Sequence, residues 1–236
     1  MEIKEAKLKV YLIDHTSNPA KIICKAAKST KYEYSLENLL EKSMTEAEKE
    51  KILTLLYNAG HLSPFEHAIY TVGIEGVSRV LTHQLVRHRI ASYSQQSQRE
   101  TNTYEYVIPD SIKEKTLERE YCTKIKEIFD FYQNLINQGI PLEDARYILP
   151  NAAETKIIMT ANVREWFHFL NLRGCYRTQW EIRNLAEKIY ALFYPTEPRL
   201  WDLAGPSCVS KGKCDQGRFS CGKAKKRRKE WENLKS

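Results

Sequence analysis

Several common sequence features are missing from this chain of 236 residues. No apolar run approaches the roughly 18 residues that cross a bilayer, and the first residues lack the basic-then-apolar order of a signal peptide. No internal repeat, CxxC pair or linker before Pro195 is evident. We therefore expect a cytoplasmic protein with no membrane partner, in which the six cysteines are thiols or ligands rather than disulfides.

Acidic residues are absent from the stretch on which the functional prediction depends. Residues 76–99 contain four arginines and two histidines but no Asp or Glu. Guanidinium groups without nearby carboxylates, beside Ser and Gln donors, suit an anionic and planar ligand, because the fork of Arg forms paired hydrogen bonds to phosphate.

The net charge of +7 is unevenly distributed. Residues 208–236 contain ten basic and three acidic residues, so the remaining chain is formally neutral. The basic composition describes this C-terminal tail and is no evidence for a nucleic-acid-binding body, so a nucleic-acid partner is not expected.

The hydrophobic spacing predicts a mixture of strands and helices that do not alternate regularly. Strands are expected at 6–13, 68–76 and 155–161, and helices at 19–28, 46–59, 114–138, 141–147, 162–171 and 179–192. We predict the α+β class, with a central twisted, mostly antiparallel sheet flanked by helices in a single domain over residues 1–207.

A further helix is predicted within residues 76–99. Its apolar stripe consists of Val77, Val80, Leu81 and Leu85. Gln84 and His88 fall on the same stripe and should point inward. A buried amide or imidazole costs about 1–3 kcal/mol if unpaired, so either backbone groups or a ligand must satisfy it.

The segment that follows Asn162 places a polar seam on an apolar helix. Arg164, His168 and Asn171 recur at i, i+4 and i+7, which suits either a ligand-lining face or bonds to backbone and solvent. Asn162 fits a helix N-cap. Arg173 ends the segment, where a solvated cation favoured by the helix dipole is the simplest interpretation.

Four motifs in order resemble the flavin-dependent thymidylate synthases. They are His61-Leu-Ser-Pro-Phe-Glu-His67, Arg87-His88-Arg89 with Ser97 after seven residues, Ala145-Arg146-Tyr-Ile-Leu-Pro150, and Asn162-Val-Arg164 through His168 to Arg173. This resemblance implies conversion of dUMP to dTMP with FAD as cofactor, NADPH as reductant and 5,10-methylenetetrahydrofolate as carbon donor. It also implies a homotetramer with shared active sites. No metal ligand is predicted among the site residues.

The resemblance also implies roles for individual residues. Those implied to bind dUMP are Gln84, Leu85, Val86, Arg87, Gln95, Gln96, Ser97, Gln98, Arg99, Arg146 and Arg173. Those implied to bind FAD are Ser63, Arg87, His88, Arg89, Asn162, Val163, Arg164 and His168. Arg173 is implied to be catalytic, because a guanidinium at the uracil edge stabilises negative charge on the ring. None of the six cysteines has the Pro-Cys-His context of the folate-only thymidylate synthases.

Two alternatives share these features: a flavin- and folate-dependent RNA uracil methylase, and a non-catalytic nucleotide- or RNA-binding protein. The sequence also departs from the family motif, since Gln95 stands where an acidic residue is frequent and Glu100 follows Arg99. In the tail, Cys208, Cys214 and Cys221 could bind a metal, but neither a CxxC pair nor a histidine supports this. The run 223–229 is expected to be solvated and mobile, or to contact a polyanion.

Overall fold

The structure is a computed structural model that describes residues 4–33, 35–101 and 104–235. Contacts divide the chain into two compact units. Unit 1 consists of Met1–Lys9, Gly73–Arg87 and Tyr93–Met159, and unit 2 of Val10–Val72, His88–Ser92 and Thr160–Ser236.

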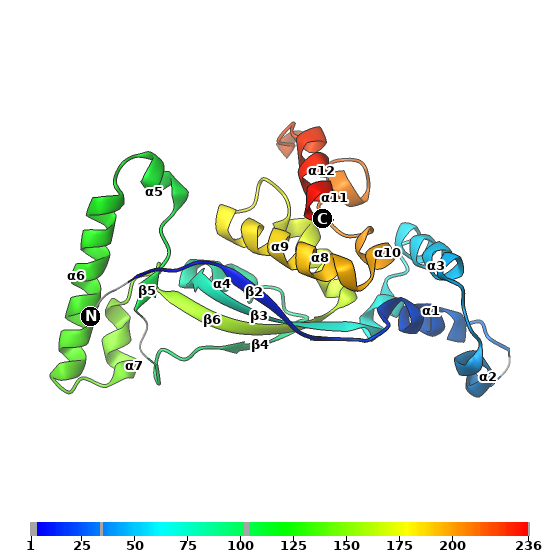
Figure 1. The fold of residues 1–236 in the computed structure, drawn as a ribbon, viewed down its shortest axis with the longest axis horizontal. Coiled ribbons are helices and arrows are strands. Elements are labelled where there is room, and N and C mark those ends of the chain that lie inside the picture. The colour runs from blue at the N-terminus through cyan, green and yellow to red at the C-terminus, as the bar shows by residue number, and fades with distance from the viewer. Residues whose placement is uncertain (1–3, 34, 102–103, 236) are drawn as a thin grey trace. The chain divides into compact units, whose positions relative to one another are not determined.

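The described strands confirm the predicted α+β class. A mostly antiparallel sheet has the strand order β2-β3-β6-β4 (Figure 1). Its strands are β2 (Lys9–His15), β3 (Ile69–Ser78), β4 (Ala91–Gln95) and β6 (Glu154–Asn162). A separate parallel pair joins β1 (Lys4–Glu5) to β5 (Glu105–Tyr106). Each strand of the larger sheet has residues in both units.

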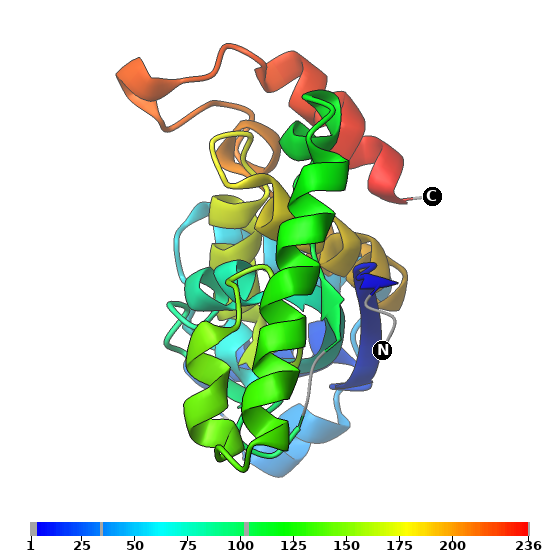
Figure 2. The same cartoon turned by 90° about the vertical axis from the view of Figure 1, so that its left-hand side faces the viewer.

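Helices make up most of the remaining described chain. The α-helices are α1 (Pro19–Ser29), α2 (Leu36–Glu41), α3 (Glu46–Asn58), α4 (Arg79–Leu85), α5 (Asp110–Glu114), α6 (Glu118–Asn137), α7 (Leu142–Ala145), α8 (Val163–Arg173), α9 (Trp180–Phe193), α10 (Pro198–Trp201), α11 (Ser207–Ser210) and α12 (Ala224–Glu232). Short 3₁₀ turns are η1 (Ser63–His67), η2 (Arg146–Ile148), η3 (Tyr194–Thr196), η4 (Gly217–Phe219) and η5 (Asn233–Lys235). Figure 2 shows α7 beside the long helix α6 in unit 1.

Local sequence signals account for several helix boundaries. The side chain of Thr45 accepts from the backbone N–H of Glu48, and the Glu48 carboxylate accepts from the backbone N–H of Thr45. This capping box starts α3, as predicted. Gly60 has φ +73° just after the helix, which is the backbone region that glycine enters without strain.

The helix predicted within residues 76–99 is shorter than expected. Strand β3 continues to Ser78, whose hydroxyl accepts the Leu81 N–H and starts α4 at Arg79. Val77 therefore belongs to the strand, and the Val80 side chain is 39% exposed. The helix ends at Leu85, so the prediction of one inward stripe from Val77 to His88 is wrong, although His88 is buried.

Each unit has its own apolar core. In unit 1 the residues Tyr106, Ile108, Ile125, Phe129 and Ala153 pack together. In unit 2 the core is aromatic, and Tyr70, Trp166, Phe193 and Trp201 contact one another ring to ring. Trp166 also donates from Nε1 to the Tyr70 carbonyl, at 3.3 Å, which fixes α8 against β3 within unit 2.

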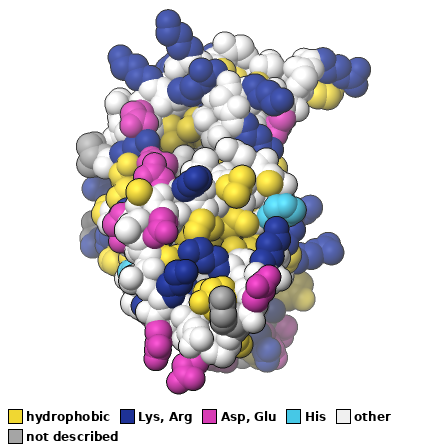
Figure 3. Space-filling view, turned by 90° about the vertical axis from the view of Figure 1, so that its right-hand side faces the viewer, with side chains coloured by type: hydrophobic (Ala, Val, Ile, Leu, Met, Phe, Trp, Pro, Cys, Tyr) yellow, Lys and Arg dark blue, Asp and Glu magenta, His cyan; other side chains and the backbone are white. Residues whose placement is uncertain are grey.

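The C-terminal residues are more structured than predicted. Trp231 of α12 is fully buried and packs on Tyr190, with ring centroids 4.6 Å apart. Arg227 is buried too, so the expectation of a wholly solvated run at 223–229 is wrong at this residue. The lysines at 223, 225, 226 and 229 are exposed. Figure 3 shows basic side chains gathered near the top of the face that it draws.

The described chain also bears on the expected absence of a membrane segment. None of its helices combines the length and apolar character needed to cross a bilayer.

A close backbone contact in unit 1 yields a stability prediction. Gly76 has φ +72°, and a Cβ added there would lie 2.0 Å from the Lys7 carbonyl oxygen. Gly139 has φ +85° but no atom within 4 Å of an added Cβ. We expect Gly139→Ala to cost about 1 kcal/mol from backbone strain alone. Gly76→Ala should cost about 3 kcal/mol or more, because the overlap adds to that strain.

Urea unfolding of both variants at one protein concentration measures the difference. Equal losses of unfolding free energy would show that the contact between Gly76 and Lys7 does not constrain the fold.

Candidate active site

Unit 2 contains a groove of about 580 Å³ at the start of α8. It is lined by Tyr57, Gly60, Leu62, Glu66, Ile90, Asn162, Arg164, Glu165, Phe167, His168, Asn171 and Lys211. The predicted polar seam of Arg164, His168 and Asn171 therefore lines a cavity. Aromatic and apolar walls with a few polar groups are typical of a cofactor or substrate site.

The first turn of α8 supplies the polar rim of this groove. Asn162 is the N-cap, as predicted, and its Oδ1 accepts the Glu165 N–H at 2.9 Å. Arg164 forms an ion pair with Glu66 of η1 at 2.5 Å, and both side chains are about half exposed. An exposed pair of this kind contributes little to stability, so an anionic ligand can replace Glu66 at low cost.

A buried hydrogen-bond chain connects α8 to the segment after α4. The Nε–H of Arg173 donates to Nε2 of His88 at 3.1 Å, and Nδ1 of His88 lies 2.9 Å from the Glu165 carboxylate. Because the guanidinium can only donate, Nε2 must accept, and His88 therefore carries its proton on Nδ1 and donates it to Glu165. His88 is 4% exposed and Glu165 6%, so both groups are shielded from water.

This hydrogen-bond chain differs from the simplest interpretation of Arg173 in the sequence, which was a solvated cation at the end of the helix. Arg173 is half-buried and held by His88 rather than solvated. His168 packs edge-on against His88, with ring centroids 5.5 Å apart. Ligand atoms of His88, Glu165 and His168 lie within 4.8 Å of one another. Both ring nitrogens of His88 already have hydrogen-bond partners, Glu165 at Nδ1 and Arg173 at Nε2.

Unit 1 contains a separate group of arginines. Arg99 forms an ion pair with the Glu143 carboxylate at 3.2 Å, and the Nε–H of Arg146 donates to the Glu143 carbonyl at 3.0 Å. Burial and the neighbouring charge of Arg146 lower the pKa of Arg79. Arg99 and Arg146 thus both contact Glu143, and the charge of Arg146 acts on Arg79, which leaves an excess of positive charge suited to an anion.

The polar segment of β4 lies in the same unit. Gln95 donates from Nε2 to the hydroxyls of Thr82 and Thr155, at 3.2 and 3.3 Å. Ser97 accepts the Arg99 N–H on its hydroxyl at 3.1 Å, which folds the chain back after the strand. Gln95 is therefore an internal hydrogen-bond donor.

The remaining predicted residues differ in exposure. Val86, Arg87, Arg89 and Ser63 are exposed, whereas Gln84, Gln96 and Gln98 are half-buried. Leu85 and Val163 are fully buried and their side chains face the core. In unit 1 the structure groups Arg99 with Arg146, and in unit 2 it groups His88, Asn162, Arg164, His168 and Arg173.

Several residues of these sites were not predicted, among them Glu165, Arg79 and Lys211. Glu165 resembles an ordinary N3 residue of a capped helix, and its partner His88 is 77 positions away. Arg79 was noted only as part of the basic stretch. Lys211 lies in the C-terminal tail, where nothing in its sequence context connects it to α8.

The chain is similar to known proteins over most of its length. The family model described as thymidylate synthase complementing protein (Thy1) matches residues 11–199. Flavin-dependent thymidylate synthases of Geobacter sulfurreducens and Clostridium tetani are each 42% identical to this chain. The alignments cover 92% and 97% of this chain and 95% and 99% of those proteins. This chain belongs to the flavin-dependent thymidylate synthase family.

The fold comparison agrees with this family. The crystal structure of a UMP/dUMP methylase PolB from Streptomyces cacaoi, bound with 5-Br dUMP, superposes with a TM-score of 0.77. It is 22% identical and covers 85% of this chain and 95% of that chain. At this identity the comparison supports the fold alone, whereas the family relatives identify the chain as an enzyme.

The N-cap of α8 yields a prediction that separates helix capping from any ligand role. Asn162→Ala removes the acceptor of the Glu165 N–H and should cost about 1 kcal/mol of unfolding free energy. Asn162→Asp retains an acceptor and adds a favourable charge at the helix N-terminus, so it should stay within about 0.5 kcal/mol of the parent. Thermal unfolding of the three proteins without ligand is the measurement. A loss in Asn162→Asp as large as in Asn162→Ala would contradict the capping role.

Proposed function

We propose that this enzyme methylates dUMP to dTMP with 5,10-methylenetetrahydrofolate as carbon donor, FAD as cofactor and NADPH as reductant. We further propose that it acts as a homotetramer with shared active sites in the cytoplasm. The observation that carries the proposal is the placement of Arg173: a helix-terminal guanidinium bonded to a buried, neutral histidine, in a chain of this family.

The groove of unit 2 fits a flavin dinucleotide. Arg164 and Lys211 would hold its pyrophosphate, because both are cations at the groove surface. Asn162 and His168 offer hydrogen-bonding groups, and Tyr57 and Phe167 offer aromatic walls. When bound, the flavin supplies the hydride and the folate supplies the one-carbon unit of the new methyl group.

The arginine group of unit 1 suits the phosphate of a nucleotide. Arg79 and Arg146 repel each other, and burial of Arg79 reduces the screening of its charge by water. A phosphate dianion bound there would relieve this repulsion and accept paired hydrogen bonds. Arg99 is tied to Glu143 in an exposed ion pair and can exchange that partner for phosphate.

Arg173 is the proposed catalytic residue. Its planar guanidinium would donate to the uracil edge and stabilise negative charge spread over the ring, and this charge makes C5 a nucleophile toward the one-carbon unit. His88 and Glu165 act as positioning residues, since they fix the direction of the Arg173 Nε–H. No covalent nucleophile is required, because this charge stabilisation activates C5 directly.

The test of this function uses the purified full chain under anaerobic conditions. We expect a yellow protein that is bleached by NADPH and forms dTMP from dUMP and methylenetetrahydrofolate. Arg173→Ala should retain most of its flavin but lose 10²- to 10³-fold in turnover, which is typical for removal of a charge-stabilising donor. The exposed helix residue Arg119 supplies the control, and Arg119→Ala should turn over normally.

Two results would overturn the proposal. One is a colourless protein that makes no dTMP when supplied with FAD. The other is methylation of uridine in transfer RNA with no reaction of free dUMP, which identifies an RNA uracil methylase.

The phosphate role of Arg146 yields a separate prediction. Hydrogen bonds to charged groups contribute about 1.5–3 kcal/mol, so Arg146→Ala should raise the KM for dUMP roughly 10- to 100-fold. Reaction with deoxyuridine, which has no phosphate, should change by less than about 3-fold in the same variant. Steady-state kinetics with both substrates are the measurement. An equal loss with dUMP and deoxyuridine would exclude a phosphate contact.

A further inference from the structure

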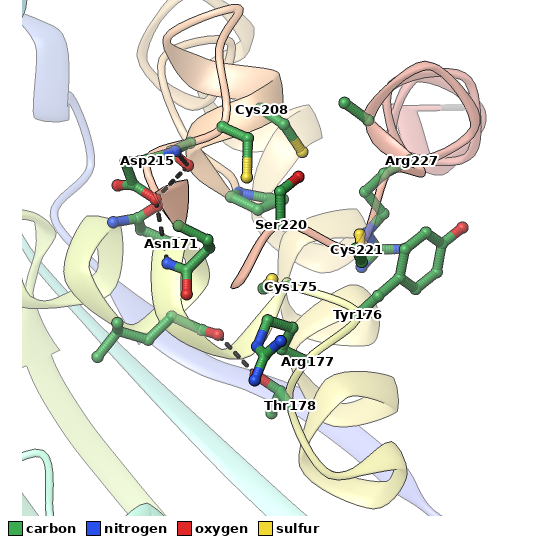
Figure 4. A pocket seen from close by; sticks show the side chains of 16 residues that line it. Asn171, Cys175, Tyr176, Arg177, Thr178, Cys208, Asp215, Ser220, Cys221 and Arg227 are labelled. Carbon is green, nitrogen blue, oxygen red and sulfur yellow. Dashed lines mark hydrogen bonds between the residues drawn. The ribbon is translucent and has the colours of Figure 1, made fainter. Parts of the chain in front are cut away.

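The three cysteines of the C-terminal segment meet a fourth in the structure. A cavity of about 150 Å³ in unit 2 is lined by Cys175, Cys208, Cys214 and Cys221. Cys175 follows the end of α8, Cys208 belongs to α11, and the other two lie in the loops before and after η4. In Figure 4 the side chains of Cys175, Cys208 and Cys221 surround this cavity.

We propose that Cys175, Cys208, Cys214 and Cys221 bind a metal centre through four thiolates. Four cysteines and no fifth protein ligand are the donor set of structural zinc sites and of iron–sulfur clusters. The prediction of no metal rested on three cysteines without a nearby histidine. The fourth ligand, 33 positions before Cys208 in the sequence, was not visible there.

The surroundings of the cavity favour negatively charged sulfur. Arg227 lines the cavity, is 2% exposed, and has a buried Nη2 with no hydrogen-bond partner. Its Nη1 pairs with Glu187 and Glu230, but a buried guanidinium nitrogen without a partner costs free energy, so an acceptor is expected beside Nη2. Thiolates bound to a metal would supply this acceptor, and Arg177 adds a further positive charge to the lining.

The loop that contributes two of the ligands buries little apolar surface, and hydrogen bonds hold it at Gly212, Asp215 and Phe219. Between Lys211 and Lys223 every residue except Cys214 is exposed. Gly212, Gly217 and Gly222 have positive φ, and the Phe219 side chain is 53% exposed. Apolar burial cannot fix such a segment, whereas metal ligation stabilises small loops without a core.

The spacing of the sulfurs bears on the kind of centre. Tetrahedral zinc with Zn–S bonds of about 2.3 Å requires sulfurs about 3.8 Å apart. Among the described residues, the possible metal ligands that come within 4.8 Å of one another in a group of three or more are His88, Glu165 and His168. No three of the four cysteine sulfurs therefore lie within that distance of one another. Zinc would draw the side chains together, while a cluster would accept a wider arrangement. Both occupants share the four-thiolate chemistry, and metal analysis distinguishes them.

The site would anchor the helix that carries Arg173. Cys175 lies two residues after Arg173, and between them Gly174 accepts the Arg227 Nε–H on its carbonyl at 2.7 Å. Lys211, which lines the groove at the start of α8, follows Cys208 by three residues. The centre would thus connect the end of α8 with Lys211 of the proposed flavin site.

The experiment measures metal in the full chain, produced in medium with zinc and iron and purified without oxygen or chelators. Plasma mass spectrometry and acid-labile sulfide analysis are the readouts, and neither depends on dUMP turnover. About one zinc per chain, or about four irons with matching sulfide, supports the proposal and identifies the occupant.

Single variants locate the ligands. Cys175→Ser, Cys208→Ser, Cys214→Ser and Cys221→Ser should each lower the metal content at least 5-fold. The matched control is Cys122→Ser, because Cys122 is half-buried on α6 in unit 1. In the unaltered chain, titration with a mercurial should finish releasing metal when four thiols have reacted, so the proposal stays testable if a serine variant fails to fold.

Three results would overturn the proposal. One is a chain that contains less than about a tenth of an equivalent of metal and, when reduced, binds no Co²⁺ with the visible bands of cobalt thiolate. Another is full metal content in all four serine variants. The third is a disulfide among these four cysteines in protein isolated under reducing conditions.

Discussion

The hydrogen-bond chain from Glu165 through His88 to Arg173 is the constraint on which the described active-site geometry depends. Each link determines the next: the guanidinium can only donate, so the imidazole must accept at Nε2 and donate at Nδ1, and the carboxylate completes the chain. His88 and Glu165 are buried, and leaving a buried polar group without its partner costs about 1–3 kcal/mol. The arrangement is therefore far more rigid than a surface arginine at a helix end.

Helix α8 combines this chain with the rest of the site in unit 2. Its first turn carries the Asn162 cap and Arg164 at the groove, and its last residue is Arg173. The opposite side is apolar, with Trp166 fixed to β3 and Phe169 in the core. The position of the polar residues thus follows from aromatic packing. Directly after the helix, Trp231 of α12 fills the space that a side chain at position 174 would need. A Cβ added to Gly174 would lie 2.7 Å from the Trp231 ring.

Local signals in the sequence predicted much of the fold, and long-range contacts account for what they missed. The capping box of Thr45 and the N-cap of Asn162 depend on residues three positions apart, so both could be predicted. The burial of Arg227 depends on Gly174, Glu187 and Trp231 around it, while its own neighbours in sequence are solvated lysines. Val80 was misplaced because the Ser78 hydroxyl, rather than hydrophobic spacing, determines where α4 begins. The family motifs identified Arg99 and Arg146, but the proximity of Arg79 to Arg146 needed the structure.

The arginine group of unit 1 is electrostatically unfavourable without a ligand, and relief of this repulsion would contribute to the proposed binding of a phosphate. Burial of Arg79, and after it the neighbouring charge of Arg146, lowers the pKa of Arg79, so both effects on this charged group oppose folding. Glu143 offsets this only partly, because its carboxylate pairs with Arg99 and its backbone carbonyl serves Arg146. A dianionic phosphate would remove the repulsion and so stabilise the folded chain as it binds. A neutral nucleoside cannot remove the repulsion between Arg79 and Arg146. The repulsion that destabilises the ligand-free protein therefore favours binding of a nucleotide over a nucleoside.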